Sequence, residues 1–154
     1  MSNKLRCNVV RALAIAGAVG FLGGCSTMQN MMGGESRSMR GEHIMLSGSN
    51  EVPASGSSAS GMGDVTVHED CTVNAKITVS GMTATAAHIH QGAAGANGPV
   101  IVPFNKTADN TFEAGSGAKM TSDQCAAYKA GNTYVNVHSA AKPGGEVRAQ
   151  LRGR

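Results

Sequence analysis

An alternation of apolar and polar residues with a period of two runs through residues 60–80, and it constrains the fold more than any other feature of the chain. After a turn-forming segment at 68–70, the side chains of one face are all apolar: Val73, Ala75, Ile77 and Val79. Before the turn, Val65 and Val67 alternate with polar residues in the same way. This pattern predicts a half-buried β-hairpin.

The rest of the chain after Gly41 continues as short strand-like runs separated by Gly, Asn and Pro. The runs occupy residues 43–47, 86–90, 99–104, 111–115, 133–138 and 146–151. Many short strands at this spacing predict an all-β sandwich or barrel. One short helix is expected after Thr121, which offers an N-cap with Gln124 three residues on, and Gly131 is its stop signal.

The first 24 residues have the pattern of an export signal rather than of a folded element. Basic residues without any acid come first (Lys4, Arg6 and Arg11), and the apolar run 12–22 follows. The run is too short to span a bilayer as a mature helix. Residues 1–24 are therefore predicted to be a signal peptide, and the chain to be exported.

The end of this segment, "LGGC", resembles a bacterial lipobox. The resemblance implies cleavage before Cys25 and attachment of lipid to its sulfur, which would anchor the protein to a membrane. Ser26 follows the cysteine, and by the same resemblance this favours the outer membrane or the periplasmic face of the envelope. Residues 25–41 are polar, contain several methionines and lack periodicity, so they are expected to form a flexible tether.

Charge argues against nucleic acid as a partner. Of the 13 Lys and Arg residues, three lie in the predicted signal peptide, which leaves ten against ten Asp and Glu, all of them after Cys25. The mature chain is therefore formally neutral and has no excess of basic residues for a phosphate backbone. Its expected partners are the membrane, through the lipid, and an envelope protein or polysaccharide.

The four cysteines divide between two roles. Cys7 would leave with the signal peptide and Cys25 would carry the lipid, so Cys71 and Cys125 remain. Two thiols in an oxidising export compartment are expected to form a disulfide. The alternative is a pair of soft metal ligands, which is less favoured because neither cysteine has a histidine at a ligand-like spacing.

A candidate metal site is centred on the sequence "AAHIH". Residues two apart on a strand share a face, so His88 and His90 would project together while Ile89 faces the core. If a neighbouring strand carries His138, three nitrogen donors meet at one point, a set suited to copper or zinc. Asn136 would share the face of His138. Glu146 would either orient an imidazole or pair with Arg148 or Lys142.

Several segments together resemble the CHRD domain, a family named from the chordin repeats. They are "LSGSNEVP", "SGMGDVTV", "ITVSGMTATAAHIHQGAAGANGPVIVPF" and "YVNVHSAAKPGGEVRAQL", in this order over roughly residues 44 to 152. The resemblance implies an immunoglobulin-like, Greek-key β-sandwich over residues 42–154. It carries the family's His-x-His segment onto His88 and His90, its "VNVH" segment onto His138, and its "GGE-R" segment onto Gly144, Gly145, Glu146 and Arg148.

These residues give one leading hypothesis of function and one main alternative. The leading hypothesis is a lipid-anchored protein that binds copper, with zinc as the lesser candidate, through His88, His90 and His138, with an affinity that falls below about pH 6.5. The alternative is a metal-free adhesion or matrix module, in which the histidines bond loop carbonyls and fix the glycine-rich segment 91–99. The His-x-His strand is also similar to that of copper–zinc superoxide dismutase. However, no further histidine–aspartate set for zinc is present, which argues against such an enzyme.

Overall fold

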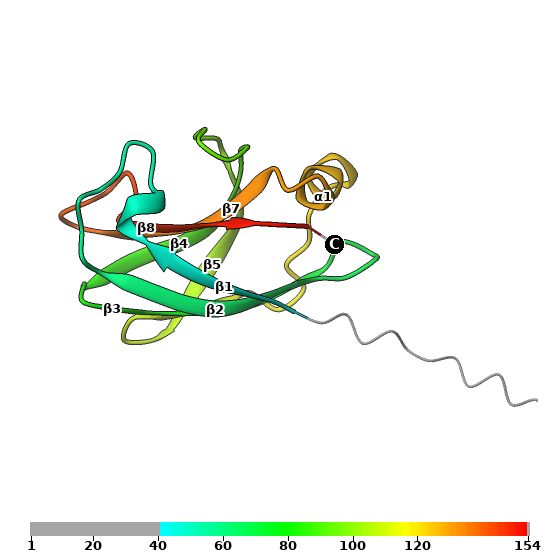
Figure 1. Cartoon of the computed structure of the whole chain (residues 1–154). Helices are drawn as coiled ribbons and strands as arrows, with labels where there is room; N and C mark the ends of the chain where they lie inside the picture. Colours follow the sequence, from blue (N-terminus) through cyan, green and yellow to red (C-terminus); the bar gives the residue numbers. More distant parts are fainter. Residues whose placement is uncertain (1–40, 154) are drawn as a thin grey trace, which may run out of the picture. The chain divides into compact units, whose positions relative to one another are not determined.

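The computed structural model describes residues 41–153, and these form eight antiparallel strands and one α-helix (Figure 1). The strands are β1 (Glu42–Ser47), β2 (Ser60–Val67), β3 (Val73–Ser80), β4 (Ala84–Gln91), β5 (Val100–Ala108), β6 (Thr111–Ala114), β7 (Thr133–Ser139) and β8 (Val147–Leu151). A short 3-10 turn, η1 (Gly48–Asn50), follows β1. The predicted signal peptide and, apart from Gly41, the predicted tether lie outside the described residues. No helix within the described range is long and apolar enough to cross a membrane.

The strands form one closed barrel in the order β1-β2-β3-β6-β5-β4-β7-β8. The all-β prediction with one short helix is confirmed, and the positions of β3 beside β6 and of β7 beside β4 are the expected Greek-key connections. The expected two-sheet sandwich is replaced by a single closed barrel. Closure depends on β1, which pairs with β2 along its length and with β8 through Ser47 and Arg148.

The hairpin predicted from the period of two is present as β2 and β3. Its strands pair in register from Ser60 opposite Ser80 to Val67 opposite Val73. The apolar face of β3 points inward, and Ile77 is completely buried. The barrel interior is filled mainly by aliphatic side chains of all the long strands, among them Ile44, Leu46, Val65, Ile89, Val135, Val137, Val147 and Leu151.

The predicted helix is α1 (Ser122–Lys129), at one end of the barrel (Figure 1). Thr121 and Gln124 form the expected capping box, which satisfies two backbone N–H groups at the helix start. Cys125 faces inward from α1 and forms a disulfide with Cys71, with their Cα atoms 5.8 Å apart. The predicted cysteine pairing is therefore confirmed, and it ties the helix to the β2–β3 turn.

The outer face of β7 and β8 is covered by two loops instead of by solvent. From residues 48–59, Asn50 donates to the backbone oxygen of Arg148. From residues 92–99, the carbonyl oxygen of Ala96 accepts from the guanidinium of Arg148 at 2.9 Å. Arg148 also lies over the ring of Tyr134, 3.4 Å from its centroid, and is only 2 % exposed. The loops thus bury polar side chains on this face, next to the histidines.

Candidate metal centre

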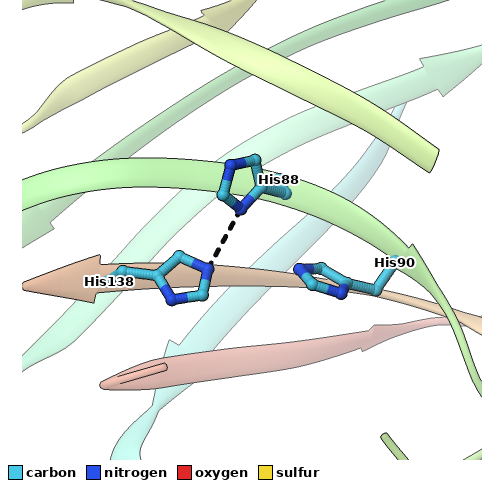
Figure 2. Close-up of side chains that lie close together, drawn as sticks. All are labelled: His88, His90 and His138. Atoms are coloured by element: carbon cyan, nitrogen blue, oxygen red, sulfur yellow. Dashed lines mark hydrogen bonds between the residues drawn. The ribbon is translucent and has the colours of Figure 1, made fainter. Parts of the chain in front are cut away.

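The pairing of β4 with β7 brings the three predicted histidines to one place. Ala86 lies opposite His138, and His90 lies opposite Tyr134. The completely buried residues Ile89 and Val137 point into the barrel, so the imidazoles of the alternating positions project from its outer side. Figure 2 shows the three rings turned toward one another, two from β4 and one from β7.

The distances between the rings are those of a single cluster. Nδ1 of His88 lies 3.0 Å from Nε2 of His138, which is the hydrogen bond drawn in Figure 2. One nitrogen of each of the three rings lies within 4.8 Å of the other two. The centroid of the His90 ring is 5.6 Å from that of His88 and 6.1 Å from that of His138. The predicted convergence of three nitrogen donors from two separate β-segments is therefore present.

His90 is held firmly in position. Its Nδ1 lies 2.9 Å from the carbonyl oxygen of Gly98, and its ring stacks on Tyr134 with an interplanar angle of 12°. Because a carbonyl oxygen can only accept, Nδ1 carries the proton and Nε2 keeps its lone pair. That Nε2 atom is buried and has no hydrogen-bond partner. The covering loop thus fixes both the tautomer and the orientation of this ring.

His138 is oriented in the same way by the turn between β7 and β8. Its Nδ1 lies 2.9 Å from the carbonyl oxygen of Pro143, so this nitrogen is the N–H donor. The lone pair of His138 Nε2 therefore points toward His88, whose Nδ1–H donates to it. Two of the three rings have a backbone carbonyl behind them and an unprotonated nitrogen in front.

The surroundings of His88 and His138 favour the neutral form of these two rings. The pKa of His88 is lowered to about 4, first by burial and then by the neighbouring rings of His138 and His90. Burial also lowers the pKa of His138, although the Pro143 carbonyl opposes this shift by stabilising the protonated ring. A neutral imidazole is the form that binds a metal ion, so these two residues are in a ligand state at neutral pH.

The two predicted supporting residues behave differently. Asn136 lies opposite His88 in the β4–β7 ladder and is 2 % exposed, and its Oδ1 has no hydrogen-bond partner. Glu146, in contrast, accepts from the hydroxyls of Ser57 and Ser139. In the described part of the chain no hydrogen bond or ion pair joins the Glu146 carboxylate to an imidazole, an arginine or a lysine, which corrects both predicted roles. The backbone N–H of Glu146 donates to Val137 near the end of β7, and this places the carboxylate beside Ser139. The hydrogen bond from Ser57 then holds the 48–59 loop to the same carboxylate.

Sequence reasoning missed two residues beside the cluster, Tyr134 and Glu51. Tyr134 lies four positions before His138 on the same strand, so the period of two that placed Asn136 on this face could also have indicated Tyr134. Glu51, from the distant 48–59 loop, could not have been found in this way. A side-chain carbon at Gly145, whose φ is 131°, would lie 2.6 Å from Oε1 of Glu51 and 2.7 Å from Nδ2 of Asn136. Glycine is therefore required where these two side chains close over the turn.

The remaining described histidines lie outside the cluster. Nδ1 of His43 is 3.1 Å from the carboxylate of Asp64, and Nε2 of His68 is 2.8 Å from the side-chain nitrogen of Asn74. Both histidines are bonded on the outer side of the barrel, away from β4 and β7.

Comparison with known families identifies the domain. The CHRD domain family matches residues 43–151, which is most of the chain. Comparisons with curated proteins and with solved structures find no match. The matched range begins within β1 and ends at the last residue of β8, so it corresponds to the whole barrel. The chain belongs to the CHRD domain family.

Proposed function

We propose that this chain is an exported, lipid-anchored CHRD protein that binds copper through His88, His90 and His138. The observation that carries the proposal is the state of His90 Nε2, a buried nitrogen without a partner that faces two other imidazoles. Leaving a buried polar atom unpaired costs about 1–3 kcal/mol, and coordination to an ion would recover that free energy.

The surroundings of the rings match what a bound metal needs. Metal-binding histidines usually donate their second N–H to a carboxylate, a backbone carbonyl or water, which fixes the tautomer and strengthens the ligand. The carbonyl oxygens of Gly98 and Pro143 do this for His90 and His138. His88 and His138 are only half-buried, so the ion would keep a side open to water or another ligand.

The donor set favours copper over zinc. A site of given nitrogen ligands binds Cu(II) more tightly than Zn(II), and three neutral imidazoles are ligands that both ions accept. Nitrogen ligands of this kind suit a protein that stores, carries or senses the ion.

Titration of Cu(II) and Zn(II) into the protein tests the metal proposal. We expect one Cu(II) per chain, bound more tightly than Zn(II), and loss of this binding in the variant His88→Ala/His90→Ala/His138→Ala. The matched control is His68→Ala, which removes a histidine outside the cluster and should bind as the unsubstituted chain does. Unchanged copper affinity in the triple variant contradicts the proposal and favours the metal-free adhesion module, in which the imidazoles serve only to hold the loops.

Export and lipidation are a separate part of the proposal and depend on residues 1–25. They are supported by the basic and apolar pattern of the segment and by the Cys71–Cys125 disulfide, since disulfides persist in oxidising compartments. Mass spectrometry of the protein from a bacterial host should show a chain that begins at Cys25 and carries acyl groups. Membrane association that survives Cys25→Ser contradicts the anchor.

A further inference from the structure

A second group of metal-binding side chains lies on the outer face of β1 and β2. In the antiparallel ladder Met45 is directly opposite Met62, and His43 is directly opposite Asp64. The residues between them, Ile44 and Gly63, belong to the inward face, as the burial of Ile44 shows. Two thioethers, one imidazole and one carboxylate therefore occupy four adjacent positions on one surface.

The two methionines are exposed to an unusual degree. Met45 is 72 % and Met62 is 57 % exposed, and within residues 41–153 Val100 is the one other large apolar side chain that is exposed. A large apolar side chain forgoes more than half of its burial free energy in such a position. Methionine differs from other apolar residues in having a flexible stem and a polarisable sulfur that can bind a soft ion.

His43 is prepared for metal binding in the way described for the first centre. Its Nδ1 lies 3.1 Å from Oδ1 of Asp64, so the proton sits on Nδ1 and the lone pair is on Nε2. A histidine backed by a carboxylate is a common arrangement around protein-bound metals. Both side chains are mostly exposed, which leaves Nε2 open to an ion from solvent.

The spacing on the ladder allows one ion to reach all three donors. Directly opposite residues have their Cβ atoms about 4.5–5.5 Å apart, and diagonal neighbours are about 7–8 Å apart. Met45 lies about 6.5–7 Å from His43 along β1. The long side chains span these distances. We infer that His43, Met45 and Met62 form a second metal site, specific for Cu(I).

The choice of Cu(I) follows from the donors. Thioether sulfur is a soft ligand that selects Cu(I), whereas a set of three imidazoles also accommodates Cu(II) and zinc. The site is distinct from the histidine centre because β8 lies between β1 and β7 in the barrel. His43 and Met45 border a hollow of about 580 Å³ between β1 and β8, which gives an ion access from solvent. The inference goes beyond the proposed function and does not require it.

Residue-resolved NMR of methionine methyl groups tests the second site. The protein is the full chain carrying His88→Ala/His90→Ala/His138→Ala, and Cu(I) is added as the probe under anaerobic conditions. We expect the methyl signals of Met45 and Met62 to shift together and saturate at one equivalent. Met120, which is buried, and Met82 are internal controls whose signals should not move. If the Met45 and Met62 signals stay in place while Cu(I) binds elsewhere, the inference is wrong.

Competition with a colorimetric Cu(I) chelator measures the contribution of each donor. Met45→Leu/Met62→Leu keeps the shape and exposure of both positions but removes the two sulfur donors. It should weaken Cu(I) binding at this site by at least about 100-fold. Loss of a supporting partner alone is expected to weaken binding by roughly 10–100-fold. Asp64→Asn should weaken binding by that smaller factor. Equal Cu(I) affinity in the leucine variant overturns the inference.

The same NMR experiment on the chain with all its histidines separates this inference from the proposed function. Shifts of Met45 and Met62 in both backgrounds support the second site even if the histidine cluster binds no copper. Shifts in neither background contradict the second site even if Cu(II) binds the cluster. This comparison also covers the case in which the triple variant folds poorly.

Discussion

Nδ1 of His88 and Nε2 of His138 lie 3.0 Å apart, from adjacent strands that are far apart in the sequence. Without metal, one proton bridges the two nitrogens. For an ion to bind between these nitrogens and His90, the proton of His88 would shift from Nδ1 to Nε2, which would leave a lone pair on Nδ1 as on His138 Nε2. The hydrogen bond and the proposed metal site are therefore alternative states of one cluster. Substitution or titration of each histidine tests how that residue contributes to the two states.

Replacement of His138 by alanine removes one donor and leaves His88 Nδ1 without its acceptor. We expect the dissociation constant for Cu(II) to rise at least about 100-fold, more than the roughly 10–100-fold typical of losing a supporting residue. Competition titration with a Cu(II) chelator measures the change. The matched control His68→Ala should leave the constant unaltered, and an equal effect of the two substitutions would argue against the cluster as the binding site.

The protonation of His88 provides a second prediction. Since its pKa is lowered to about 4 from 6.5 in the folded chain, the ring should remain neutral at pH 5, where an ordinary imidazole is about 97 % protonated. Protons should therefore compete for this ligand only near pH 4, lower than the value of about 6.5 expected from sequence alone. NMR titration of the His88 ring checks this, and a midpoint near 6.5 contradicts it.

The same shift determines how stability depends on pH. Between pH 6.5 and about 4 the unfolded chain binds a proton at His88 and the folded chain does not. The contribution of His88 to the free energy of unfolding is therefore fully present above pH 6.5 and is lost as the pH falls through this window. Urea unfolding at pH 7, 5.5 and 4 should show the decline, and His88→Asn should make it less steep.

Arg148 is predicted to stabilise the loop that holds His90. Its guanidinium bonds Asn97 and the carbonyl of Ala96 and lies over Tyr134. Arg148→Met removes these bonds and leaves buried acceptors unpaired, so we expect a loss of about 2–4 kcal/mol in the free energy of unfolding by urea. Arg152→Met, which changes an exposed side chain near the same chain end, should cost less than about 0.5 kcal/mol. Similar values for both variants would contradict this role.

The disulfide is predicted to contribute substantially to stability. It joins cysteines 54 positions apart, and closing a loop of this length is worth about 4 kcal/mol when its effect is on the entropy of the unfolded chain. Cys71→Ser/Cys125→Ser should lower the free energy of unfolding by about 2–4 kcal/mol, and a reducing agent should have a similar effect on the unsubstituted chain. A reducing agent that leaves the urea midpoint unchanged would exclude this contribution.

Local patterns predicted the strands, the helix and the shared face of the first two histidines. The alternation from Val73 to Val79 sufficed for β3, and the capping pair Thr121 and Gln124 marked the start of α1. His88 and His90 lie on one face because residues two apart on a strand project to the same side. The position of His138 beside them was a hypothesis that required the pairing of β4 with β7, and the structure provides that pairing.

The contacts between residues far apart in the sequence could not be predicted from local sequence patterns. Barrel closure places β1 beside β8, where Ser47 pairs with Arg148 about a hundred residues away, and no local pattern encodes this pairing. Arginine is almost never fully buried unless it is paired, so the sequence offered no reason to expect a buried side chain at Arg148. Its burial results from the two loops that cover it. The carbonyls of Gly98 and Pro143 that orient the imidazoles come from loops whose paths only the fold determines.

Pulsed electron paramagnetic resonance of the protein with one equivalent of Cu(II) tests the central claim most directly, because electron spin echo modulation counts the coordinated imidazoles. The account predicts three in the unsubstituted chain and two in His90→Ala. Cu(II) that binds with the same number of imidazoles in His88→Ala/His90→Ala/His138→Ala as in the unsubstituted chain would contradict it.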